Sequence, residues 1–182
     1  CDQWALPTGI VIFTELTLTV SNQMRIDSNA ALHVGYTLPT NTAQPYVQIE
    51  CGQLALQNGG DLYVYSMPTN VAFTNYGALV TVAGICSIAS NSWMVPISQP
   101  KGGGTVKFRM GQLIVEPGGG FNADGRGYRG GEGTSGWGFG PGRGTCSSYY
   151  GGGGGHGGRG GNGSHGTGGS PYDRTNAPLL PG

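Results

Sequence analysis

The sequence carries little charge and no excess of either sign. Of its 182 residues only 10% are charged, and nine Lys and Arg balance nine Asp and Glu, whereas about 25% of an ordinary soluble domain is charged. Such sparse and balanced charges produce only a weak electrostatic field. The charge therefore does not favour binding to nucleic acid, an anionic membrane or an acidic substrate. Surface polarity must come from Asn, Gln, Ser, Thr and backbone amides, a composition typical of extracellular fibres and adhesins.

Long hydrophobic runs are also missing. The longest apolar stretch, GIVIF from Gly9 to Phe13, is far shorter than the roughly 18 residues that a membrane helix needs, so we predict no membrane span. The sequence begins at Cys1 without an initiator Met or a positively charged leader. We therefore expect a processed chain or a piece of a longer protein, folded as one domain or as one domain with an appendage.

The four cysteines lack the spacing of a metal centre, and no cofactor is predicted. Cys51 and Cys86 fall on alternating apolar positions and are expected to be buried thiols. Cys1 and Cys146 are the better disulfide candidates, within a subunit or between subunits, if the compartment is oxidising.

A repeat occupies the first two thirds of the chain. GQLALQNGGDLYV from Gly52 aligns with GQLIVEPGGGFNA from Gly111, and NQMRIDSNAALHV from Asn22 and GICSIASNSWMVP from Gly84 fit as two further copies. Successive copies start 30, 32 and 27 residues apart. A period of this size is typical of repeat architectures.

At each of several aligned positions, the four copies carry residues of the same chemical kind, and we call such a set of residues a column. Apolar residues alternate within each copy, as in a strand with one buried face. One further column holds only Asn and Gly, the residues that most readily adopt a left-handed backbone, and predicts a turn. The apolar columns are Met24, Leu54, Cys86 and Leu113, then Ile26, Leu56, Ile88 and Val115, then Leu32, Leu62, Met94 and Phe121, and the turn column is Asn29, Gly59, Asn91 and Gly118.

These features predict an all-β chain with a parallel β-solenoid over residues 1–125. Each coil would stack on the next at about 4.8 Å, so that like residues lie over like. The alternative is an antiparallel sandwich whose strands resemble one another by chance. The predicted solenoid core contains Met24, Ile26, Leu54, Leu56, Ile88, Leu113, Val115 and Phe121.

Glycine dominates the last third. Ten of the 38 glycines precede Gly111 and 28 lie from there on, so we predict a boundary near Gly125 and a glycine-rich extension over residues 126–182. Such a bias ordinarily favours a flexible linker. The ordered alternative, which we predict, is a set of polyproline-II-like chains packed closely, because no Cβ blocks hydrogen bonds between neighbours. The extension would pack among its own segments or against a flat face of the solenoid.

The order of parts here resembles a known family. GQLIVEPGGGFNADGRGYRGG leads into GGGGGHGGRGG and then SPYDRTNAPLLPG, which is similar to the glycine-rich segment of very large secreted proteins with right-handed parallel β-helices. The resemblance covers roughly residues 80–182 and implies a β-helix and an extracellular location, but little chemistry. Two departures stand out: Asp173 and Arg174 follow Tyr172 in place of Gly-Ser, and the sequence stops at Gly182 where another coil is expected.

Candidate catalytic and metal-binding residues do not converge in the alignment. Enzymes with a parallel β-helix that act on polysaccharides need clustered carboxylates, or calcium with a basic residue, on one strand face. Asp27, Glu50, Asp61 and Glu116 fall in different columns or distant coils, so we predict that the chain is not an enzyme. In the glycine-rich part, turn capping and hydrogen bonds to glycine carbonyls explain Asp124, His156, His165 and Asp173 better than a metal does.

Aromatic residues punctuate the glycine tract. Trp137, Tyr149 and Tyr150 are candidates for stacking on glycans; the alternative is that such aromatics, Phe139 among them, pin the tract onto a core. Asn162 begins Asn-Gly-Ser, a glycosylation acceptor if the protein is eukaryotic and secreted. Arg-Gly-Gly tripeptides are typical of RNA-binding tails, but the near balance of arginines and acids in the tail argues against binding of nucleic acid.

Together these patterns predict a non-catalytic extracellular structural protein that is a subunit or repeat of a fibre, hair or surface layer. Self-association is expected because the open ends of a solenoid present unpaired strand edges. The alternative is an adhesin or fibre-tip module that binds surface glycans. A polysaccharide lyase or hydrolase ranks below both.

Overall fold

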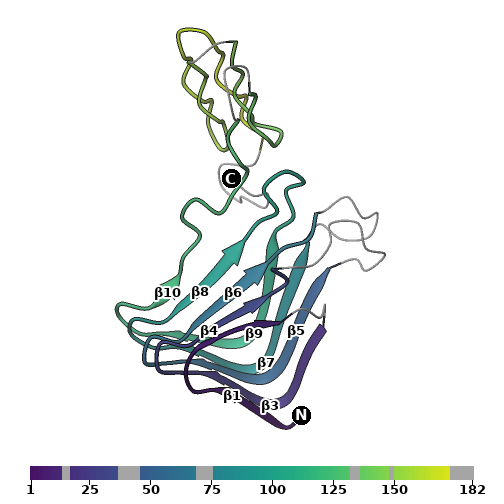
Figure 1. Ribbon diagram of the computed structural model, residues 1–182, viewed down its shortest axis with the longest axis vertical. Coiled ribbons are helices and arrows are strands. Elements are labelled where there is room, and N and C mark those ends of the chain that lie inside the picture. The colour runs from purple at the N-terminus through teal and green to yellow at the C-terminus, as the bar shows by residue number, and fades with distance from the viewer. Residues whose placement is uncertain (14–16, 37–45, 69–75, 132–135, 148–149, 173–182) are drawn as a thin grey trace. The chain divides into compact units, whose positions relative to one another are not determined.

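A computed structural model describes residues 1–13, 17–36, 46–68, 76–131, 136–147 and 150–172 (Figure 1). These residues contain ten β-strands and no helix. The chain divides into two compact units, the first formed by Cys1–Ser98 with Gly104–Arg126 and the second by Gln99–Gly103 with Gly127–Gly182. We describe each unit by itself.

The first unit consists of two parallel five-stranded sheets (Figure 1). In chain order each odd-numbered strand is followed by an even-numbered strand, and we call the two a strand pair. The odd sheet has the order β1 (Gln3–Leu6), β3 (Thr17–Ile26), β5 (Val47–Leu56), β7 (Ala78–Ile88) and β9 (Val106–Val115). The even sheet has the order β10 (Gly120–Phe121), β8 (Trp93–Ile97), β6 (Asp61–Tyr65), β4 (Ala31–Val34) and β2 (Ile10–Phe13).

Residues predicted to share a column are paired with one another on adjacent strands. Every pairing between the described strands is parallel, so the expectation of parallel strands is confirmed and the antiparallel alternative is wrong. Along the odd sheet Met24 pairs with Leu54, Leu54 with Cys86 and Cys86 with Leu113. On the same strands, Ile26 pairs with Leu56, Leu56 with Ile88 and Ile88 with Val115. Along the even sheet Leu32, Leu62, Met94 and Phe121 pair in the same way.

The turn column has the conformation that its residue types predict. Asn29, Gly59, Asn91 and Gly118 have φ angles of 59°, 81°, 59° and 83°, which lie in the left-handed region that Asn and Gly tolerate best. Successive turns are also hydrogen bonded to each other, because Asn29 N donates to Asn58 O and Asn91 N donates to Gly118 O, each at 3.0 Å.

The sequence comparison missed the first strand pair. β1 continues the odd sheet, with Gln3 opposite Gln23 and Trp4 opposite Met24, and β2 continues the even sheet, with Val11 opposite Leu32. The available signal was the alternation in QWALPTGIVIF after Gln3. It was obscured because the turn from β1 to β2 is one residue shorter than the turn from β3 to β4.

The odd strands after β1 are longer than the short strands expected, at ten or eleven residues. Their register shifts in mid-strand, for example between Val20 and Gln23 on β3 and between Cys51 and Leu54 on β5. Glycine begins three of the four copies, at Gly52, Gly84 and Gly111, because the backbones approach closely there. A Cβ on Gly52 would lie 2.5 Å from Asn22 O, and one on Gly111 would lie 2.6 Å from Ala83 O.

The hydrophobic core of the first unit combines the inward columns of both sheets. Met24, Ile26, Leu54, Leu56 and Ile88 are at most 1% exposed. The prediction that the core also contains the last copy was wrong, because that copy forms the edge strands β9 and β10, beyond which no described strand pair lies. Leu113, Val115 and Phe121 are 46%, 44% and 39% exposed.

Candidate functional site

The last strand pair presents an apolar edge. β9 is an edge of the odd sheet and β10 an edge of the even sheet, and the rings of Phe108 and Phe121 meet there edge to face with centroids 5.2 Å apart. Edge strands offer unpaired N–H and C=O groups to another strand. We call Phe108, Leu113, Val115 and Phe121, with the outer sides of β9 and β10, the trailing edge.

The opposite edge of the two sheets carries matching residues. Through the pairing register Trp4 belongs to the column that ends in Leu113, Leu6 to the column that ends in Val115, and Val11 to the column that ends in Phe121. Ile10 and Ile12 on β2 are 73% and 48% exposed. We call β1 and β2 the leading edge, and its columns continue those of the trailing edge.

An aromatic cluster on the even sheet escaped the sequence analysis. His33 and Tyr63 stack with centroids 4.3 Å apart and planes inclined by 3°, and His33 Nδ1 lies 3.1 Å from the Tyr65 hydroxyl. Because His33 lies on β4 and Tyr63 on β6, the stacked rings stabilise the pairing of these two strands. The available signal was that His33 and Tyr63 occupy the same position in two copies. Burial lowers the pKa of His33.

Two carboxylates of the first unit link successive strand pairs, whereas Glu50 lies within β5 and accepts a hydrogen bond from Gln48 Nε2 of the same strand. Asp27 accepts hydrogen bonds from Gln57 Nε2 at 2.9 Å and Asn58 Nδ2 at 2.7 Å, which tie one strand pair to the next and lower the pKa of Asp27 to about 2. Asp61 accepts from Trp93 N at 2.8 Å, and burial raises its pKa. In the described ranges no group of three or more His, Cys, Asp and Glu is arranged to hold a metal.

Acid should weaken the fold through Asp27. Its pKa falls from 3.8 to about 2 on folding, so the unfolded chain binds the proton more readily, and this carboxylate stabilises the fold fully only above pH 3.8. We expect the denaturation midpoint to fall as the pH drops from 3.8 towards 2, measured by circular dichroism in urea. Asp27→Asn should show a smaller decrease over that interval. An unchanged decrease would assign the acid sensitivity to other groups.

The cysteines differ in environment. Cys51 and Cys86 are 6% and 0% exposed, and burial raises the pKa of Cys51 to about 11 and of Cys86 to about 12, which makes both thiols unreactive at neutral pH. Cys1 is exposed and Cys146 is half-buried. Cys1 belongs to the first unit and Cys146 to the second, so a disulfide between them, within a subunit or between subunits, stays a prediction.

Most of the backbone hydrogen bonds that join neighbouring segments of the second unit recur every third residue. Its segments 142–147, 151–156, 158–163 and 166–172, which we call the glycine bundle, are joined by bonds of 2.8 to 3.1 Å. The donor and acceptor pairs with this interval are Gly152 to Thr145 and Gly155 to Gly142; Gly153 to Gly161 and His156 to Gly158; Gly160 to Gly169 and Gly163 to Gly166; and Gly169 to Gly153 and Tyr172 to His156. Two further bonds, Thr145 to Thr167 and Ser147 to His165, have donors two residues apart.

Close approach, and not an unusual backbone conformation, explains the glycine in this bundle. None of the described glycines after Gly140 has a positive φ. A Cβ on Gly152 would instead collide with Thr167 O, one on Gly168 with Gly160 O, and one on Gly169 with Gly142 O. The segments can therefore lie at hydrogen-bonding distance only if side chains are absent at these positions.

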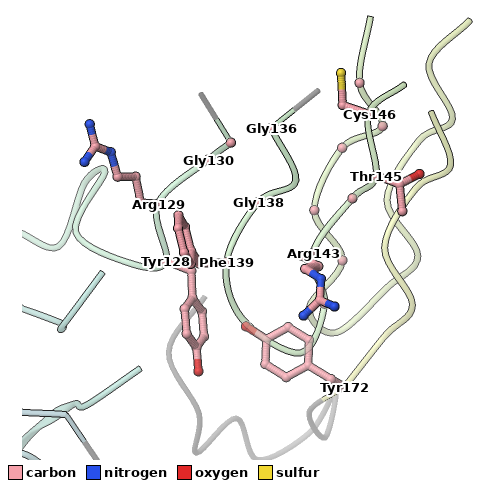
Figure 2. A pocket seen from close by; sticks show the side chains of 18 residues that line it. Tyr128, Arg129, Gly130, Gly136, Gly138, Phe139, Arg143, Thr145, Cys146 and Tyr172 are labelled. Atoms are coloured by element: carbon pink, nitrogen blue, oxygen red, sulfur yellow. The ribbon is translucent and has the colours of Figure 1, made fainter. Parts of the chain in front are cut away.

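A cavity of about 510 Å³ opens within the second unit (Figure 2). Eleven of its 18 lining residues are glycine, and among the others are Tyr128, Phe139, Arg143 and Tyr172. In Figure 2 the Arg143 guanidinium lies near the Tyr172 ring, whereas the Arg129 side chain points away from both. Arg143 Cζ lies 5.5 Å from the centroid of the Trp137 ring.

The glycan-stacking candidates take part in separate contacts. Trp137, 53% exposed, donates from Nε1 to Cys146 O at 3.2 Å, while Tyr150, 62% exposed, lies 5.8 Å from the His165 ring. Tyr149 lies outside the described residues. A joint role of Trp137 and Tyr150 in glycan stacking stays a prediction.

The glycosylation candidate and the residues considered for a metal are also dispersed. Asn162 is exposed, and its Oδ1 accepts from Gly168 N at 2.8 Å. His156 contacts the Tyr172 ring edge to face, and Asp124 N donates to Asn122 Oδ1 at 3.0 Å. Asp173 lies outside the described residues.

Comparisons with known proteins add no homologue to this description. The described residues include no helix long and apolar enough to cross a membrane. No protein-family model, no curated protein and no solved structure matches the chain.

Proposed function

We propose that this chain is a non-catalytic structural element of an extracellular fibre, hair or surface layer. In this proposal the strand pairs are coils of a parallel β-solenoid, and the glycine bundle is a polyglycine-II-like extension. Support for the solenoid comes from the alternation of odd and even strands in two parallel sheets with one register. Support for the extension comes from the three-residue interval of its hydrogen bonds, which equals the number of residues per turn in polyproline II.

The match between the two edges carries the proposal. The trailing edge exposes Leu113, Val115 and Phe121, and the leading edge holds Trp4, Leu6 and Val11 in the same columns. If the leading edge of one copy stacks on the trailing edge of another, both the strand hydrogen bonds and the apolar columns continue. Such a contact joins two different surfaces, so it repeats without closing and generates a filament.

A charge on the trailing edge should stop this growth. We expect the wild-type chain to form assemblies with increasing concentration, and Leu113→Lys to stay monomeric, because the column would then end in a cation that cannot be buried without a partner. Sedimentation velocity over a concentration series measures the effect, and negative-stain electron microscopy shows whether the assemblies are filaments.

Ile85→Lys is the matched control for this experiment. Ile85 is 39% exposed, close to the 46% of Leu113, but it lies on β7 inside the odd sheet and not at its edge. This variant should assemble as the wild type does. A wild-type chain that remains monomeric at every concentration, or equal loss of assembly in both variants, would contradict the proposal.

An adhesin that binds surface glycans is the second candidate. The exposure of Trp137 and Tyr150 favours it, because aromatic side chains in water commonly mark recognition surfaces. Binding of the monomeric Leu113→Lys chain to a glycan array, together with no filaments from the wild type, would select this function over the first.

A further inference from the structure

Ile10 is the most exposed large apolar side chain on the described strands. It lies on β2 and is 73% exposed. On one side it pairs with Ala31 of β4, and on the other side no described strand follows, because β2 is an edge of the even sheet. Burial of a branched apolar side chain is favourable, so the outer side of Ile10 is a candidate contact with another molecule.

Ile10 begins a column on the outer face of the even sheet. This column alternates along the strands with the inward column that ends in Phe121, so its side chains point away from the core. Asp61 and Trp93 belong to it because each directly precedes a residue of the pair Leu62 and Met94. The outer column is Ile10, Ala31, Asp61, Trp93 and Gly120.

At the far end of this column the Trp93 ring lies beside Gly120. Gly120 is buried although it belongs to the edge strand β10. A Cβ on Gly120 would meet one atom within 4 Å, Trp93 Cζ3 at 3.6 Å, its chain neighbours aside. The Trp93 side chain therefore reaches from β8 to the trailing edge, where Gly120 adds no side chain of its own. Trp93 is half-buried, so part of it is open to contact.

We propose that Ile10 of one copy packs beside Gly120 and against the Trp93 ring of another copy, and that this contact makes stacking selective. The inference rests on the proposed function, because the leading edge must stack on the trailing edge. It adds the side chains by which the two edges recognise each other on the outer face. Ile10 then continues its own column beyond Gly120, where the missing side chain leaves room, and a β-branched residue against an aromatic ring is a favourable cross-strand pair.

Both sheets can adopt this register at once. The first strand pair already pairs with the second through β1 and β3 and through β2 and β4. The last strand pair offers the same spacing as the second, because the interval from Val115 to Phe121 equals that from Ile26 to Leu32. Ile10 can therefore lie opposite Gly120 while the odd strands β1 and β9 are also in register.

Ile12 provides a matched comparison on the same strand. It has the same residue type, points to the same face and is 48% exposed. Its column continues through His33 and Tyr63 and reaches Asn122, whose N donates to Met94 O next to the last pair of β10. A stacked copy would therefore place Ile12 against a polar side chain, which offers less apolar surface than Trp93 does.

The test compares Ile10→Thr with Ile12→Thr in the full chain. Threonine keeps the β-branched shape that strands favour, so both variants should fold, and circular dichroism checks this. Sedimentation velocity over a concentration series measures the concentration at which assemblies form. We expect that concentration to rise about tenfold in Ile10→Thr and less than about threefold in Ile12→Thr.

Photo-cross-linking locates the contact directly. With p-benzoylphenylalanine in place of Ile10, and with isotope-labelled and unlabelled chains mixed, we expect cross-links between molecules at peptides that contain Trp93 or Gly120. Cross-links at other peptides, or equal effects of Ile10→Thr and Ile12→Thr on assembly that Leu113→Lys still blocks, would overturn this inference and leave the proposed function standing. A wild-type chain that stays monomeric would overturn both.

Discussion

Leu54→Ala should lower the free energy of unfolding of the first unit by about 2 to 5 kcal/mol. Leu54 is 1% exposed and lies between Met24 and Cys86 in its column. The rigid strands on either side prevent collapse of the space that the truncation leaves, so the loss of transfer free energy is joined by a cavity cost. Urea denaturation followed by far-ultraviolet circular dichroism measures the loss.

Leu113→Ala is the control for that result, because the same substitution is made in the same column. Leu113 is 46% exposed on the trailing edge, so we expect a loss of less than about 1 kcal/mol. The measurement must be made on monomers, since stacking of a second copy would bury Leu113. Equal losses in the two variants would show that the column is covered at both positions.

Gly169→Ala should unfold the glycine bundle and leave the two sheets intact. Gly169 is buried, donates to Gly153 O and accepts from Gly160 N, and a Cβ there would collide with Gly142 O. Overpacking of this kind costs about 1 to 3 kcal/mol in ordinary cores. The effect should be larger here because the obstructing atoms are backbone and cannot change rotamer.

Amide hydrogen exchange measures this second effect residue by residue. We expect protection to be lost across residues 142–172 in Gly169→Ala, while the amides of β3, β5 and β7 remain protected. In Gly161→Ala, whose new Cβ would meet no atom within 4 Å, protection should persist in both units. Equal protection in the two variants would mean that the bundle does not depend on close glycine contacts.

Much of the first unit could be predicted because its pairing partners are the equivalent residues of successive repeats. The turn column Asn29, Gly59, Asn91 and Gly118 was recognisable from residue type alone, since a left-handed backbone restricts the choice to few residues. The first strand pair was missed because a turn shortened by one residue breaks the spacing on which alignment depends. The stacked rings of His33 and Tyr63 were missed because the comparison considered only the apolar columns and the turn column.

Exposure could not be predicted with the same success. Leu113 and Leu54 are the same residue type in the same column, but one ends the stack and the other lies inside it. In the glycine bundle the partner of each segment was beyond prediction for a further reason. Identical glycines carry no side-chain pattern from which a pairing could be read.

The sequence by itself determined which residues share a column and where the left-handed turns lie, because parallel strands in register convert sequence period directly into spatial neighbours. Only the tertiary structure decided which end of each column is uncovered and which residues of the glycine segments are paired. Those properties depend on the neighbours of a residue in space. A glycine has no side chain, so its residue type does not indicate which segment lies beside it.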